Sequence, residues 1–161
     1  MLAPETFKDV MSGVAASVTV VTAEGPDETV GITVSAFTSV SADPPIVLVC
    51  IDKRAGSLPA FLAAEGYTVN FMPEGTGDIA MVFATPGADK FGSVDTSAPE
   101  SGHGGPVLDA AFASFECSVI DRVEMGDHWV LYGQVEGGGR TDTEVDSLIW
   151  SKRGFVRVQR Y

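Results

Sequence analysis

Short β-branched and apolar runs separated by turn residues recur along most of the chain, and this pattern limits the folds open to it. Runs of about 4–8 such residues, bounded by glycine, proline or aspartate, are typical of strands. The runs that fit lie at residues 17–23, 29–41, 46–51, 67–72, 112–125, 128–136 and 148–158. The run at 29–41 is long for one strand, which predicts a bend or bulge midway. Consecutive strands with few helices favour a closed or nearly closed β-barrel, in one domain spanning residues 1–161.

Three segments have helical features instead. Apolar residues recur at helical spacing from Phe7 to Val14, which predicts a short helix over residues 4–13. Ser57 is well placed as the N-cap of a second helix, and GDIAMVFA predicts a third over residues 77–84. Residues 85–108 form a long stretch rich in glycine, proline and serine. Loops of this length in a compact domain are typically functional or mobile.

The charge of the chain disfavours two classes of partner. The net charge is −12 and the pI about 4.3, so the surface repels nucleic acid and anionic membranes. No apolar run approaches the roughly 20 residues that span a bilayer, and the amino terminus lacks the features of a secretory signal. Cys50 and Cys117 lie within apolar strand patterns, which favours buried free thiols. Together these features predict a cytoplasmic protein.

Several motifs with known chemistry are missing from the sequence. It has no G-x-G-x-x-G between a strand and a helix, no phosphate-binding P-loop and no G-x-S-x-G nucleophile. His103 and His128, with two cysteines at unrelated spacing, make a poor zinc set. A nucleophilic pair of Cys50 and His128 stays open, although a thiol within an apolar strand has a raised pKa and low reactivity. The sequence therefore favours neither a metal site nor a catalytic triad.

Small and hydroxyl-bearing residues are concentrated in the run VGITVSAFTSVS at residues 30–41. A strand with a purely structural role would carry bulkier side chains on its buried face, whereas small residues let a ligand approach the backbone. Basic residues form two clusters, Lys53 with Arg54 and, near the carboxyl terminus, Lys152, Arg153, Arg157 and Arg160. For any single basic residue, solvated surface charge is the better interpretation, but clusters of them in so acidic a chain leave a small anionic ligand open.

The order of several segments resembles the flavin reductase family. These segments are FKDVMSGVAASVTVVTA, GITVSAFTSVSADPPIVLVCI, VNFM, KFG, GGPVLDAAFASFECSV and GDHWVLYGQV, and the similarity runs over residues 5–158. The resemblance implies a mainly β, Greek-key, FMN-binding split barrel with a few short helices. It implies an NAD(P)H:flavin oxidoreductase that reduces FMN or FAD and supplies reduced flavin to a separate monooxygenase. It also implies a homodimer in which the neighbouring subunit completes the flavin site.

The same resemblance implies which residues hold the cofactors. The flavin ring would lie along the strand from Thr33 to Thr38, and its phosphate near Ser57. The residues implied for flavin are Thr33, Val34, Ser35, Ala36, Phe37, Thr38, Cys50, Ile51, Asp52, Lys53, Ser57, Phe83, Ala84, Lys90 and Phe91. Those implied for the nicotinamide cofactor are His128 and Arg153.

Alternatives remain open at this point. The chain could be an FMN-binding carrier or sensor without catalysis, or a split-barrel oxidase of the pyridoxamine-phosphate-oxidase type. The sequence does not choose FMN over FAD, or NADH over NADPH. Asn70 would satisfy a local turn, and Trp129 and Trp150 would lie in the core or a dimer interface.

Overall fold

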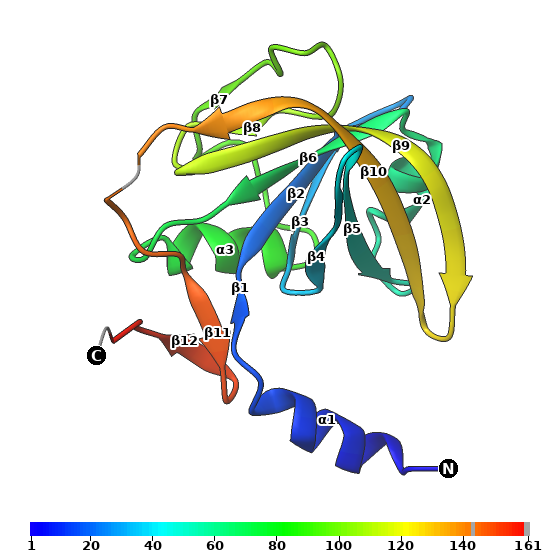
Figure 1. Cartoon of the computed structure of the whole chain (residues 1–161), viewed down its shortest axis with the longest axis vertical. Helices are drawn as coiled ribbons and strands as arrows, with labels where there is room; N and C mark the ends of the chain where they lie inside the picture. The colour runs from blue at the N-terminus through cyan, green and yellow to red at the C-terminus, as the bar shows by residue number, and fades with distance from the viewer. Residues whose placement is uncertain (143, 160–161) are drawn as a thin grey trace.

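The computed structural model describes residues 1–142 and 144–159 and consists mainly of antiparallel strands (Figure 1). The helices of the described chain are α1 (Pro4–Ser12), α2 (Leu58–Ala63) and α3 (Gly77–Ala84). Its main sheet contains β2 (Thr19–Glu24), β3 (Thr29–Val34), β4 (Phe37–Ala42), β5 (Pro45–Asp52), β6 (Gly66–Phe71), β9 (Ala113–Met125) and β10 (His128–Arg140). Shorter strands are β1 (Ala16–Ser17), β7 (Thr96–Ser97), β8 (Val107–Leu108), β11 (Ile149–Ser151) and β12 (Gly154–Val156). The three predicted helices are therefore confirmed to within a residue or two.

The corner between β3 and β4 forces the main sheet to curl. The strand order is β3-β2-β6-β9-β10-β5-β4, so β3 and β4 lie at opposite ends of the sheet. Two residues alone, Ser35 and Ala36, connect these ends, and the Cys50 amide donates to the Ala36 carbonyl at 2.9 Å. A flat sheet cannot satisfy so short a connection, so the sheet closes on itself with a split between β3 and β4. The bend predicted midway along residues 29–41 is confirmed at this corner, which divides the run into two strands. The mainly β split barrel is confirmed as well.

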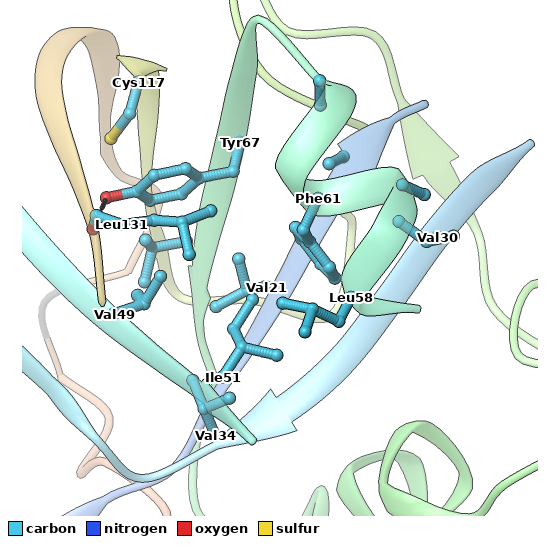
Figure 2. Packing of buried hydrophobic residues seen from close by; sticks show 14 of the residues in the cluster. Val21, Val30, Val34, Val49, Ile51, Leu58, Phe61, Tyr67, Cys117 and Leu131 are labelled. Carbon is cyan, nitrogen blue, oxygen red and sulfur yellow. Dashed lines mark hydrogen bonds between the residues drawn. The ribbon is translucent and has the colours of Figure 1, made fainter. Parts of the chain in front are cut away.

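The barrel interior is filled by apolar side chains from opposite strands (Figure 2). Val21, Val49, Tyr67 and Leu131 have no exposed surface, and Phe61 of α2 closes one end. The Tyr67 hydroxyl donates to the Leu131 carbonyl at 3.2 Å, which satisfies the one polar atom of that ring. Cys117 is buried and free, as predicted.

Strand β2 is buried on both faces, which explains why its sequence, TVVTAE, is apolar or hydroxyl-bearing almost throughout. Val21 and Ala23 belong to the barrel interior, whereas Val20 faces a second cluster with Phe83 of α3 and Leu108. Helix α3 is therefore fixed against the outside of the barrel beside β3. This placement matters because the cavities described below lie along α3.

The second half of the long loop is tied to the barrel wall by buried polar side chains. Thr22 and Thr68 donate to the carbonyls of Pro106 and Gly105 at 2.6 and 2.7 Å. Asn70, which has no exposed surface, accepts from the Leu108 amide at 2.8 Å and donates to the Val20 carbonyl at 3.1 Å. The prediction that Asn70 satisfies a local turn was wrong, because its partners are 38 and 50 residues away.

Glu116 is a second anchor for this loop. Its side chain accepts from the amides of Glu100 and Ser101 at 3.1 and 2.7 Å, and the residue is 3% exposed. Burial raises the pKa of Glu116, but the hydrogen bonds from Ser101 and Glu100 lower it more, so the pKa lies below its usual value.

We expect Glu116→Gln to lower the free energy of unfolding by about 1–3 kcal/mol at neutral pH, because the amide accepts these bonds more weakly than the carboxylate. A group with a lowered native pKa stabilises the fold above its unfolded pKa, and that contribution is lost as pH falls through the native value. The difference between wild type and variant should therefore shrink below about pH 4.3. Urea titrations at several pH values measure it, with the exposed Glu65→Gln as control. A difference in the free energy of unfolding between wild type and variant that stays constant with pH would contradict this role of the carboxylate.

Helix α1 lies apart from the barrel, beyond the small sheet of β1, β11 and β12 (Figure 1). Its side chains are exposed or half-exposed, including Phe7, Val10 and Met11. No helix within the described residues is long and apolar enough to cross a membrane.

Candidate functional site

Three cavities follow one another along α3. The large cavity, of about 760 Å³, lies at the carboxyl end of the helix, and the hairpin cavity, of about 500 Å³, lies at its amino end. Between them is a small cavity of about 160 Å³. Ala84 lines both the large and the small cavity, and Met81 and Phe155 line both the small and the hairpin cavity. An elongated ligand could therefore extend from one cavity into the next.

The large cavity is built where β3, α3 and the long loop meet. The Lys90 ammonium donates to the Gly31 carbonyl at 2.8 Å, and the Phe91 ring contacts Phe83 edge-on at 5.3 Å between centroids. A Cβ atom at Gly31 would lie 2.5 Å from the Phe83 ring, so glycine is needed for this close approach. Partial burial lowers the pKa of Lys90. The loop thus contributes one cation and one aromatic wall.

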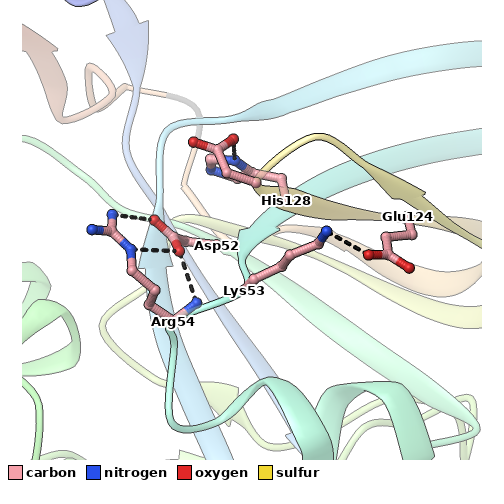
Figure 3. Close-up of polar contacts among 6 residues, drawn as sticks. Asp52, Lys53, Arg54, Glu124 and His128 are labelled. Carbon is pink, nitrogen blue, oxygen red and sulfur yellow. Dashed lines mark hydrogen bonds and ion pairs between the residues drawn. The ribbon is translucent and has the colours of Figure 1, made fainter. Parts of the chain in front are cut away.

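The rim of the large cavity carries paired charges (Figure 3). Arg54 donates to both carboxylate oxygens of Asp52, at 3.1 and 2.7 Å, and this holds the pKa of Asp52 well below its usual range. Across the β5–β10 pair, His128 lies opposite Asp52 and is 2.7 Å from an oxygen of Asp127. The hydrogen bond from His128 lowers the pKa of Asp127. Asp52 and Arg54 therefore line the large cavity, whereas His128 and Asp127 lie beside them, outside its lining.

The small cavity lies between β3, α3 and the β11–β12 hairpin. Its polar lining comes from Thr33 and Ser35, and its aromatic wall from Trp150 and Phe155, whose rings meet edge-on at 5.1 Å between centroids. The Thr33 hydroxyl donates to the Ala80 carbonyl at 2.6 Å, so it anchors the helix, whereas Ser35 is exposed. The lining of the cavity is mostly apolar.

The structure brings together about half of the residues predicted for flavin. The large cavity is lined by Asp52, Ser57, Phe83, Ala84, Lys90 and Phe91, and the small cavity by Thr33, Ser35 and Ala84. The prediction that Ser57 is the N-cap residue of α2 is confirmed, although its side chain makes no capping hydrogen bond within the described chain. Its hydroxyl is therefore available to the cavity.

The other predicted residues lie outside these cavities. The side chains of Val34, Phe37 and Ile51 pack into or against the barrel core, so ligand contact there is limited to main chain. Ala36 and Thr38 are exposed, Cys50 is half-buried with a pKa raised by burial, and Lys53 pairs with Glu124. The nicotinamide contacts at His128 and Arg153 stay predictions, because both residues lie outside the three cavities.

The sequence analysis missed several of the residues that line these cavities. Met81 and Phe155 were not singled out, Trp150 was assigned to the core or an interface, and Arg157 was noted only as part of a basic cluster. Among these residues, only Arg157 was indicated by a sequence feature, the basic cluster near the carboxyl terminus. The spacing of apolar residues within one segment does not predict that the β11–β12 hairpin lies next to α3. The two segments are about 70 residues apart in the sequence.

Comparison with known proteins identifies the family. The chain is 34% identical to "FMN reductase (NADH) RutF" of Enterobacter sp. (strain 638), over 97% of this chain and 94% of that protein. It is 39% identical to the reductase component of a 4-nitrophenol 4-monooxygenase/4-nitrocatechol 2-monooxygenase of Rhodococcus opacus, over 80% of this chain and 68% of that one. The chain spans 57% and 42% of two longer relatives from Rhizobium meliloti (strain 1021).

The fold agrees with that of a solved relative. The structure of an NADH:FAD oxidoreductase from Streptomyces globisporus C-1027, in complex with NAD and FAD fragments, superposes with a TM-score of 0.90 at 31% identity. The match covers 99% of this chain and 96% of that one. Residues 11–159 also match the family described as "Flavin reductase like domain". On both grounds, the chain belongs to the flavin-reductase-like family.

Proposed function

We propose that the protein is a flavin reductase that transfers hydride from a reduced nicotinamide cofactor to a flavin. The observation that carries the proposal is the junction of the large and small cavities at Ala84. One flavin nucleotide needs both of the environments that meet there, an apolar slot for its ring and cations for its phosphate. Pockets of this kind, mostly apolar with a few placed polar groups, are typical of cofactor sites.

The residues present fit a flavin nucleotide. In the small cavity the ring would lie between Thr33 and Ser35 on one side and Trp150 on the other, where aromatic stacking is favourable. In the large cavity Ser57, Arg54 and Lys90 would hold the phosphate end, since hydroxyl and cationic donors suit phosphate oxygens. The apolar walls exclude water from the ring edge. Phe91, through Phe83, would keep the loop closed over the site.

The reaction places few demands on the side chains. When bound, flavin supplies the chemistry by accepting a hydride at N5 from nicotinamide C4 and a proton from water, which leaves reduced flavin and the oxidised nicotinamide. The protein residues hold the two rings at reacting distance and restrict their motion, an effect that can supply several kcal/mol of the barrier. This division of labour agrees with the lack of a catalytic triad in the sequence.

Turnover measurements test the function. Purified protein mixed with NADH and excess free FMN or FAD should oxidise many equivalents of NADH per chain. A bound yellow cofactor without NADH oxidation would instead support a carrier or sensor. Oxidation of a pyridoxamine-type substrate without NADH would support the oxidase alternative.

We expect Ser57→Asp to weaken FMN binding at least about tenfold while riboflavin binding changes little, because the new carboxylate repels only the phosphate-bearing ligand. Loss of one charge-assisted contact is typically worth about 1.5–3 kcal/mol. Fluorescence titration of both flavins gives the two affinities. Ser93→Asp, on the exposed part of the loop, is the control. Equal losses for FMN and riboflavin would place the phosphate elsewhere.

The reduced flavin would pass to a separate oxygenase. The relative from Rhodococcus opacus, whose name identifies it as the reductase component of a monooxygenase, supports this. In support of a homodimer, α1 carries exposed apolar residues at helical spacing, Phe7, Val10, Met11 and, just beyond the helix, Val14. A nine-residue helix is too short to be stable alone in water. A second copy would cover this face.

We expect Val10→Glu to convert a dimer into monomers, because the charge would be buried without a partner in the interface. Size-exclusion chromatography with light scattering measures the mass of each species. Lys8→Gln, on the same helix, makes the same change of one unit of charge and is the control. A wild-type protein that is monomeric at all concentrations would exclude the homodimer.

A further inference from the structure

Met81 differs in its position from the other four of the five methionines in the chain. It lies on α3, is 50% exposed, and lines both the small cavity and the hairpin cavity. Met72 is fully buried, and within the described residues no other methionine lines any of the three cavities. The Met81 thioether has no part in the flavin contacts proposed above, so its position next to them is unexplained by those contacts.

This position exposes Met81 to an oxidant that flavin reduction itself produces. Reduced flavin that is not consumed by an oxygenase transfers two electrons and two protons to O₂, which gives oxidised flavin and hydrogen peroxide. The small cavity is the proposed site of the flavin ring, so peroxide formed there arises in a space that Met81 lines. Because Met81 is half-exposed, peroxide from solution reaches it as well.

Oxidation of Met81 changes the chemistry of the cavity wall. The sulfur attacks one peroxide oxygen, an S–O bond forms as the O–O bond breaks, and water leaves. The resulting sulfoxide is polar and carries a hydrogen-bond acceptor, whereas the thioether is apolar. Its neighbours in the small cavity include Val18, Ala84 and Phe155, whose side chains have no donor to offer. A buried acceptor without a donor is unfavourable, so a flavin ring that covers the sulfoxide binds less tightly.

We propose that Met81 is a site of oxidative modification, at which peroxide from the reoxidation of reduced flavin converts the thioether to the sulfoxide and weakens flavin binding. This inference rests on the proposed function, which supplies the reduced flavin. The modification slows flavin reduction when no oxygenase consumes the product, and so limits further formation of peroxide. Enzymatic reduction of the sulfoxide to the thioether restores the site.

Treatment with added hydrogen peroxide tests the effect on affinity without turnover. Peptide mass spectrometry gives the fraction of sulfoxide at each methionine, and fluorescence quenching gives the Kd for riboflavin and FMN before and after treatment. Both Kd values should rise about tenfold in wild type, the usual cost of an unsatisfied buried acceptor, and methionine sulfoxide reductases for both epimers should reverse the rise.

Two variants assign this effect to one residue. In Met81→Leu, a change that conserves volume, treatment should leave each Kd unchanged from its value before treatment. Met125→Leu is the matched control, because Met125 is 61% exposed and lies outside the three cavities. This variant should lose flavin affinity on treatment as wild type does.

Turnover in air tests where the oxidant arises. With NADH, FMN and catalase in solution, Met81 should be oxidised faster than Met125, although Met125 is the more exposed of the two. Catalase removes peroxide from solution, but peroxide formed in the small cavity meets Met81 first. Without FMN the difference should disappear.

Three results would separate the possible failures. If the Kd for flavin is the same with Met81 oxidised, or if Met81→Leu loses affinity on treatment as wild type does, the modification does not control binding. If Met81 and Met125 are oxidised at equal rates during turnover with catalase, the oxidant does not arise in the small cavity. If the protein does not oxidise NADH, the proposed function fails, while treatment with added peroxide still decides whether oxidation of Met81 weakens flavin binding.

Discussion

Ser35→Phe is expected to reduce flavin affinity by more than about 100-fold, a change of about 2.7 kcal/mol or more. Ser35 lines the small cavity, which measures about 160 Å³ and is proposed to hold the flavin ring. A phenyl group at this position would fill much of that space and separate the ring from the main chain of β3. Because Ser35 is exposed, the fold itself should tolerate the larger side chain. Fluorescence quenching of riboflavin and FMN on titration with protein measures the affinity.

The matched control is Ser39→Phe. Ser39 is also exposed and lies on β4, outside the three cavities, so the same substitution there should leave flavin affinity within about twofold. Thermal unfolding of both variants verifies that they fold. Should Ser35→Phe bind flavin as tightly as wild type, the ring does not occupy the small cavity. In that case the large cavity would have to accommodate the whole ligand.

Asn70→Ala is expected to lower the free energy of unfolding by about 3 kcal/mol, the largest stability loss foreseen for a single polar side chain here. The substitution leaves the Leu108 amide and the Val20 carbonyl without their side-chain partner in a fully buried site. Each buried polar group left unsatisfied costs about 1–3 kcal/mol. Urea denaturation at neutral pH, followed by tryptophan fluorescence, gives the value.

The loss of Asn70 should also release the loop. Because the Leu108 amide anchors its carboxyl end, limited proteolysis is expected to cleave residues 85–108 faster in the variant than in wild type. Thr29→Ala is the control, since the Thr29 hydroxyl is exposed and donates to the carboxylate of Glu24. A change in stability below about 1 kcal/mol would mean that water replaces the amide.

Local patterns in the sequence determined the elements themselves. The apolar run at 77–84 became α3 with the same bounds, and the strands at 112–125 and 128–136 meet in a turn at Gly126 and Asp127. These features depend on residues close in sequence, whose spacing fixes which face is apolar. The resemblance to flavin reductases, in turn, depended on ordered segments such as DPPIVLVCI and identified the fold and the family.

The tertiary structure alone decided how those elements meet. The two-residue corner at Ser35 and Ala36 splits a run that reads as one strand, because barrel closure requires its halves at opposite sheet ends. Asn70 accepts a hydrogen bond from Leu108, 38 residues away, and Trp150 lines the same cavity as Thr33 and Ser35. Such contacts join segments far apart in sequence, and their energy depends on the complementary shape of both sides. A periodic pattern predicts which face of one element is apolar, but not which other element packs against that face. The position of the site along α3 therefore follows only from the tertiary structure.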